Sequence, residues 1–289
     1  MKRIIVVSLI MNILLAAGCS QSNEETAAPN KLGVAVSIPP QKAFVQAVGG
    51  KLVTVVTMIP PGNSPGNYAP SPKEFTKFSE AKIYFSLGVP ADQANILPKA
   101  KKINSKLQIV KVNKKVAEVY PERKFSTGSR DPHIWLSPKR VKVMVNIIAQ
   151  QLSELDPEHK QQYKQNAEKY ITKLEQINRE IKQVLSQVES KTFIVYHPAF
   201  GYFADEYGLE MIAVERGGKE ATPKRLQAVI DQARQKNIKV IFHQAEIDSH
   251  QSEALAQELG GKTVMIDPLA VDYLANLRKM AETFKTVLE

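Results

Sequence analysis

The feature that most restricts the fold of this sequence is a long amphipathic run from Asp156 to about Val188. Its apolar side chains recur at steps of three and four residues and form one stripe along a helix. They are Tyr163, Ala167, Tyr170, Leu174, Ile177, Ile181, Leu185 and Val188. Asp156 is a candidate N-cap, and Pro157 suits the first helical position, where its missing N–H costs nothing. At about 1.5 Å per residue the run spans about 48 Å, longer than a helix confined to one small domain needs.

Segments of alternating strand-like and helix-like pattern lie on both sides of this run. Such alternation predicts parallel sheets with helices on both faces. We therefore expect an α/β fold of two lobes, each with a mainly parallel sheet flanked by helices, joined by one long backbone helix. An isolated coiled-coil segment would show the same period and is the alternative. The expected boundaries are an N-terminal lobe at 31–155, the linking helix at 156–190 and a C-terminal lobe at 191–289.

The N-terminus has the pattern of an export signal. Lys2 and Arg3 precede an apolar run that is too short for a comfortable membrane span, and small residues lie just before Cys19. The segment Ala16-Ala17-Gly18-Cys19 resembles a bacterial lipobox, although Leu15 lies one place earlier than the usual Leu. We expect a lipoprotein signal peptide at 1–18, lipidation of Cys19 and a flexible polar tether at 19–30. A plain signal peptide with an incidental cysteine is the alternative.

The cysteine content and the net charge further restrict how the chain can be stabilised and what it can bind. Cys19 is the only cysteine, so no intrachain disulfide can form and the fold must rest on its core. The formal net charge is +10, but the lysines lie mainly at helix-surface spacing. This dispersion argues against nucleic-acid binding and is better explained by attraction to an anionic membrane surface. We expect a monomer.

Polar residues that follow strands are the candidates for a binding site, because ligands bind parallel sheets at the carboxyl ends of their strands. His197 follows the apolar segment TFIVY, Asp267 follows TVMI, and His133 lies in the turn DPHIW. Two imidazoles and a carboxylate suit zinc and would also accept manganese or iron. Taken singly, each residue could equally be a hydrogen-bonded structural residue.

Taken together, these segments resemble a known family over essentially the whole mature chain. The lipobox, the PPG loop after the second strand, DPHIW, YHPAFGYFADEYGL, the Gln244-Ala245-Glu246 turn, IDPL and the long helix are similar to those of the zinc and manganese solute-binding lipoproteins of ABC importers, solute-binding protein family 9, cluster A-I. The resemblance implies a metal held between two lobes, with His133, His197 and Asp267 as ligands. A His rather than a Glu at position 197 is the arrangement of zinc-preferring members.

The sequence departs from the family pattern at the first ligand. The family loop reads Pro-His-Thr-Tyr-Glu-Pro, whereas this chain reads Pro65-Gly66-Asn67-Tyr68-Ala69-Pro70, which puts Gly66 in the place of a His. Zinc prefers four ligands, so water, Asn67, Glu246 or another group has to complete the site. Tyr68 is expected to line the cleft.

These observations predict an exported, membrane-anchored receptor on the extracytoplasmic face that captures a divalent cation, most readily zinc, for a membrane permease and its ATPase. Two alternatives stay open. A metallohydrolase could use the open coordination position with Glu246 as general base, although the sequence has no HExxH motif and no nucleophile elbow. A degenerate receptor that lost metal binding with Gly66 could serve another solute. We expect binding and no enzymatic activity.

Overall fold

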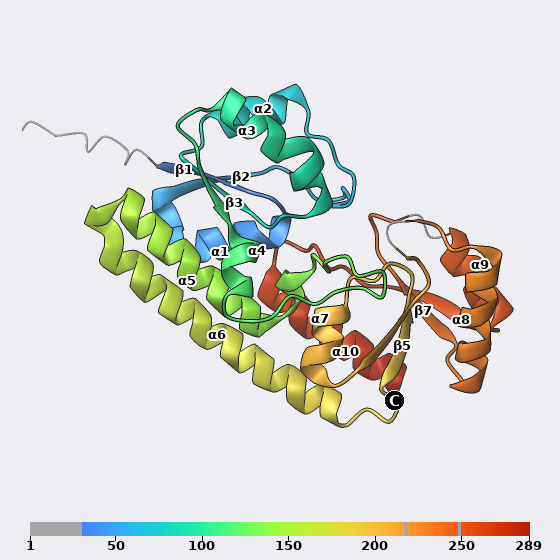
Figure 1. Ribbon diagram of the computed structural model, residues 1–289. Helices are drawn as coiled ribbons and strands as arrows, with labels where there is room; N and C mark the ends of the chain where they lie inside the picture. The colour runs from blue at the N-terminus through green and yellow to red at the C-terminus, as the bar shows by residue number, and fades with distance from the viewer. Residues whose placement is uncertain (1–30, 217–218, 248–249) are drawn as a thin grey trace, which may run out of the picture. The chain divides into compact units, whose positions relative to one another are not determined.

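The computed structural model describes residues 31–216, 219–247 and 250–289 (Figure 1). Residues 31–289 form one compact unit. The predicted signal peptide, Cys19 and tether lie outside the described residues. Across those ranges no helix is both long enough and apolar enough to span a bilayer.

Two four-stranded sheets organise this unit, and every strand pair in them is parallel. The first has the order β2-β1-β3-β4 and the second β6-β5-β7-β8. The strands are β1 (Leu32–Val36), β2 (Val53–Thr57), β3 (Ile83–Ser86), β4 (Gln108–Lys111), β5 (Thr192–Val195), β6 (Glu210–Ala213), β7 (Val240–His243) and β8 (Lys262–Met265). In each sheet the chain order reverses beside the first strand, between β1 and β3 and between β5 and β7. Such reversals open a crevice at the carboxyl ends of the strands.

Helices cover the sheets and connect them. They are α1 (Pro39–Gly49), α2 (Pro72–Ser79), α3 (Leu97–Ile103), α4 (Val112–Ala117), α5 (Pro138–Leu155), α6 (Lys160–Ser186), α7 (Gly201–Tyr207), α8 (Pro223–Gln235), α9 (His250–Glu258) and α10 (Tyr273–Leu288). Ser71, Ser137 and Thr222 cap α2, α5 and α8, each accepting a bond from a backbone N–H in the first turn. The short α4 follows β4 directly. With the two sheets and the long helix, the predicted two-lobe α/β class is confirmed.

The long helix α6 runs beside α5 and contacts α1 on one side of the molecule and α10 on the other (Figure 1). Its predicted apolar stripe is buried from Tyr163 to Leu185. Its start differs from the prediction, because residues Pro157–His159 form a 3-10 turn before the α-helix begins. The Asp156 side chain caps no backbone N–H and instead accepts hydrogen bonds from the Tyr163 hydroxyl at 2.6 Å and from His159 Nδ1 at 2.8 Å.

One hydrophobic core passes through both sheets and the helices between them. Tyr273 of α10 packs its ring edge-on against Phe44 of α1, with 4.8 Å between ring centroids. Its hydroxyl donates to the backbone carbonyl of Trp135 at 2.7 Å, and the Trp135 indole donates to the carbonyl of Pro268 at 2.8 Å. The two halves of the chain are therefore fastened together beside the turn that carries His133.

Candidate metal centre

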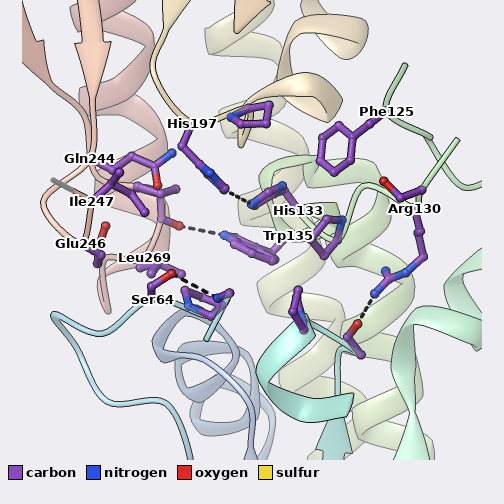
Figure 2. A pocket seen from close by; sticks show the side chains of 18 of the residues that line it. Ser64, Phe125, Arg130, His133, Trp135, His197, Gln244, Glu246, Ile247 and Leu269 are labelled. Atoms are coloured by element: carbon purple, nitrogen blue, oxygen red, sulfur yellow. Dashed lines mark hydrogen bonds between the residues drawn. The ribbon is translucent and has the colours of Figure 1, made fainter. Parts of the chain in front are cut away.

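Two histidines predicted from the sequence meet in the structure. His133 lies at the start of a 3-10 turn (Ile134–Leu136) that leads into α5, and His197 follows β5 by two residues. Their Nε2 atoms are 3.3 Å apart (Figure 2). Two donors bonded to one tetrahedral zinc at about 2.05 Å lie about 3.3 Å from each other. The two rings thus already have the separation that a shared tetrahedral metal requires.

Each ring is oriented by a carboxylate on its other nitrogen. His133 Nδ1 lies 2.8 Å from Asp131 Oδ1, and His197 Nδ1 lies 2.9 Å from Glu215 Oε2. An imidazole that donates from Nδ1 has a lone pair on Nε2, which is the form that binds metals. With both Nδ1 atoms donating, the two Nε2 lone pairs face each other, an arrangement that a cation shared by both rings satisfies.

The carboxylate partners are themselves held by the fold. Asp131 is fully buried, accepts the backbone N–H of His133 at 3.0 Å and pairs with Arg123 at 3.1 Å. Glu215 extends β6, where its N–H donates to the carbonyl of Tyr196 at 2.9 Å, and this pairing carries its side chain to His197. Sequence reasoning missed both carboxylates. Two features of the sequence could have indicated them. Asp131 lies two residues before His133 in the DPH turn, and Glu215 lies just after a strand.

A cavity of about 460 Å³ opens beside the histidines. Its walls come from the loop after β2, the turn after β3, the segment before α5 and the turns after β5, β7 and β8. The lining residues are Ser64, Pro65, Gly66, Gly88, Pro90, Gln93, Phe125, Ser129, Arg130, Pro132, His133, Trp135, His197, Pro198, Gln244, Glu246, Ile247, Pro268 and Leu269. In Figure 2, Gln244 and Glu246 lie on one side of the histidines and Phe125 and Arg130 on the other.

The histidine rings differ in their surroundings. His133 is buried, and this burial lowers its pKa below the ordinary value, with the charges of His197 and Arg130 acting in the same direction and Asp131 opposing them. For Glu246, by contrast, burial raises the pKa, and the neighbouring charge of Asp267 acts in the same direction. Its Oε2 atom is buried and has no hydrogen-bond partner among the described residues.

The remaining predicted residues take different positions. Asp267 is partly buried next to the lining residue Pro268, and its Oδ1 accepts the N–H of Leu269 at 2.7 Å. Gly66 lines the cavity, whereas Asn67 and Tyr68 do not. The Tyr68 hydroxyl donates to the carboxylate of Glu74 at 2.8 Å. Within residues 31–216, 219–247 and 250–289, no group of three or more His, Cys, Asp or Glu side chains converges on one point.

Comparison with known proteins identifies the family. The family described as zinc-uptake complex component A, periplasmic, matches residues 34–287. The chain belongs to this family. A crystal structure of ZnuA superposes with a TM-score of 0.85 at 34% identity and covers 90% of this chain and 100% of that one. The high-affinity zinc uptake system protein ZnuA of Bacillus subtilis is 27% identical over 271 residues, 89% of this chain and 85% of its own.

Another relative of this chain is the manganese ABC transporter substrate-binding lipoprotein PsaA of Streptococcus mitis. It is 25% identical over 260 residues, 86% of this chain and 84% of PsaA. The family expected from the motifs is confirmed, and with it the class of metal-import receptor rather than enzyme. The relatives' names include both zinc and manganese, so family membership establishes that the solute is a divalent metal. Which metal is bound depends on the donor groups of the site.

Proposed function

We propose that this protein captures zinc in the cavity beside His133 and His197 and delivers it to the permease and ATPase of an ABC importer. The observation that carries the proposal is the 3.3 Å separation of the two Nε2 atoms, each on a ring whose Nδ1 faces a carboxylate. Imidazole pairs suit zinc, and a harder ion such as manganese prefers more oxygen donors. Zinc is therefore the preferred solute, with manganese or iron as weaker ones.

The third ligand in this proposal is Asp267, the carboxylate that follows β8. Glu246 supports a cation at the same place, because a buried carboxylate oxygen without a partner gains most from a nearby positive charge. The charge of Glu246 interacts with those of both Asp267 and His197. A half-buried carboxyl whose pKa is raised by burial and by a neighbouring carboxylate, next to two imidazoles, favours occupation by a dication. In the absence of a side chain at Gly66, the fourth coordination position is open.

The membrane anchor belongs to the proposal as well. The relative PsaA is named a lipoprotein, and the sequence before Cys19 has the lipobox-like pattern. We expect cleavage before Cys19, lipidation of its thiol and a monomeric receptor held at the extracytoplasmic face by the tether at 19–30.

The test uses the chain from residue 20, which contains the whole compact unit. After treatment with chelator, zinc and manganese are titrated in parallel by calorimetry into the unaltered sequence, His197→Ala and His159→Ala. We expect one zinc per chain, a weaker response to manganese, and at least a 100-fold loss of zinc affinity in His197→Ala. His159 lies in the 3-10 turn before α6, outside the cavity, so its variant should bind zinc normally. Failure of both metals to bind the unaltered protein would contradict the proposal.

A further inference from the structure

The cavity is much larger than a bare metal ion. Volumes of about 300–1,000 Å³ are typical of sites for organic small molecules, and the 460 Å³ found here lies in that range. Phe125, Trp135, Ile247 and Leu269 contribute apolar surface to its walls. A hydrated cation gains nothing from such surface, whereas the carbon skeleton of an organic ligand does.

A permanently charged guanidinium, that of Arg130, lies in the wall of this cation site. Arg130 lines the same cavity as His133 and His197. Among residues 31–216, 219–247 and 250–289 its one carboxylate contact is loose, with 3.9 Å between Arg130 Nε and Glu122 Oε1. A guanidinium close to a bound dication repels it, so Arg130 disfavours a bare ion.

The guanidinium is anchored and still has hydrogen-bonding capacity. Its Nη2 donates to the carbonyl of Gly88, as Figure 2 shows. Gly88 is fixed in turn, because its N–H donates to the buried Asp92 at 2.8 Å and its φ of 66° is one that glycine adopts readily. Arg130 Nη1 is buried and finds no hydrogen-bond acceptor in the described part of the chain. A guanidinium N–H group that has no acceptor and lies next to a cavity is a suitable hydrogen-bond donor for a carboxylate ligand.

We infer that the solute is a divalent cation carrying its own small organic carboxylate ligand, and that Arg130 binds the carboxylate while the histidines bind the metal. This inference rests on the proposed function. One carboxylate oxygen fills the fourth coordination position of the metal, and a further carboxylate oxygen pairs with the guanidinium. The bound anion cancels the repulsion between Arg130 and the dication, and the apolar wall covers the carbon skeleton.

Citrate is the probe for this inference, since it binds zinc and carries spare carboxylates. Equilibrium dialysis with ⁶⁵Zn and ¹⁴C-citrate measures both partners at once on the same chain from residue 20. We expect one citrate retained per zinc, none without zinc, and an apparent zinc affinity at least tenfold higher with citrate than without. If the solute is the bare ion, citrate competes with the protein and lowers the apparent zinc affinity. Citrate retention without zinc would also overturn the inference. Zinc retained neither alone nor with citrate would instead refute the proposed function.

Variants separate the role of Arg130 from general charge. Arg130→Gln should lose at least tenfold in citrate retention, and Arg130→Lys should be intermediate because it keeps the charge without the fork. Lys124→Gln removes an exposed cation from the segment that pairs with Arg130 and should retain citrate normally. Unchanged citrate retention in a folded Arg130→Gln, verified by its thermal unfolding, would refute the assignment.

Gly66→His provides a complementary change. A Cβ at Gly66 meets only the flexible Ser64 hydroxyl, at 3.2 Å, so the larger side chain can be accommodated. The imidazole supplies a fourth protein donor at the cavity wall. We expect this variant to bind zinc without citrate and to retain at least tenfold less citrate than the unaltered protein. Citrate retention that stays stoichiometric would contradict the open position as the place where citrate binds the metal.

Discussion

At the scale of single residues, protons and metal compete for the same Nε2 atoms. We predict that zinc affinity falls as the pH is lowered from 7.5 to 5, by up to about tenfold per pH unit for each protonated ring. Burial lowers the pKa of His133, so this ring stays neutral below the ordinary histidine pKa of about 6.5 and loses metal only in more acidic solution. Calorimetric titrations across this range measure the effect. Equal affinity at pH 5 and pH 7.5 would rule out the histidines as ligands.

The same shift has a consequence for the metal-free protein. Between the lowered pKa of His133 and about 6.5, the unfolded chain binds more protons than the folded chain, so acidification through this range destabilises the fold. Added zinc binds only the folded form and opposes the change.

The residues of the site could be predicted only in part. His133 and His197 follow from their places beside strands and turns. Asp131 and Glu215 could not be assigned, since acidic residues are common in loops and their pairing depends on a strand register that the sequence does not reveal. Arg130 was one of several dispersed cations, and its position at the cavity depends on the turn at Gly88.

At the scale of elements, two tyrosines on α6 differ in whether their hydroxyl groups are hydrogen-bonded. The Tyr163 hydroxyl donates to Asp156 at 2.6 Å, whereas the buried Tyr170 hydroxyl has no partner in the part of the chain that the structure covers. Tyr163→Phe should lower the free energy of unfolding by about 1 kcal/mol, and Tyr170→Phe should change it by less than about 0.5 kcal/mol or raise it. Urea unfolding at constant m-value compares the two variants. A larger loss for Tyr170→Phe than for Tyr163→Phe would contradict this account of the helix.

The long helix itself could be predicted because an apolar stripe that continues over many turns is rarely found outside a helix. The first turn of this helix could not be predicted in the same way. Aspartate before a proline is a common N-cap, but Tyr163 and His159 compete for the Asp156 carboxylate. Burial alone would raise the pKa of Asp156, yet the hydrogen bonds from these residues outweigh it and the pKa lies below its ordinary value. The short α4 escaped prediction because a six-residue helix has too little periodicity to distinguish it from a loop.

At the scale of the whole molecule, the shared core restricts relative motion of the halves. Trp135, Pro268 and Tyr273 connect the two halves by hydrogen bonds beside the metal-binding turn, and α6 contacts elements of both. We predict that the radius of gyration of the anchor-free protein changes by less than about 1 Å when metal binds, as expected of small rocking rather than hinge closure. X-ray scattering of chelator-treated and zinc-loaded protein tests this. A reduction of several ångströms on loading would show that the halves separate in the metal-free state.

The alternation of strands and helices was enough to predict the parallel sheets, since parallel strands need crossover connections. The joining of the cores was not predictable, because it depends on which face of the last helix meets the first half. That information lies in contacts such as Tyr273 with Phe44, which are more than 200 residues apart in the chain.

The position of α10 has a consequence for how the protein is made. This helix is synthesised after the other helices and strands of the compact unit, yet its Tyr273 packs on Phe44 of α1 and its Phe284 lies in the core beside Phe193. A chain still emerging from the ribosome cannot close this core. The core between α1 and the second sheet stays open until α10 is available, because Phe284 packs on Phe193 of β5 and Phe242 of β7. The compact unit therefore cannot fold fully before this helix has left the ribosome.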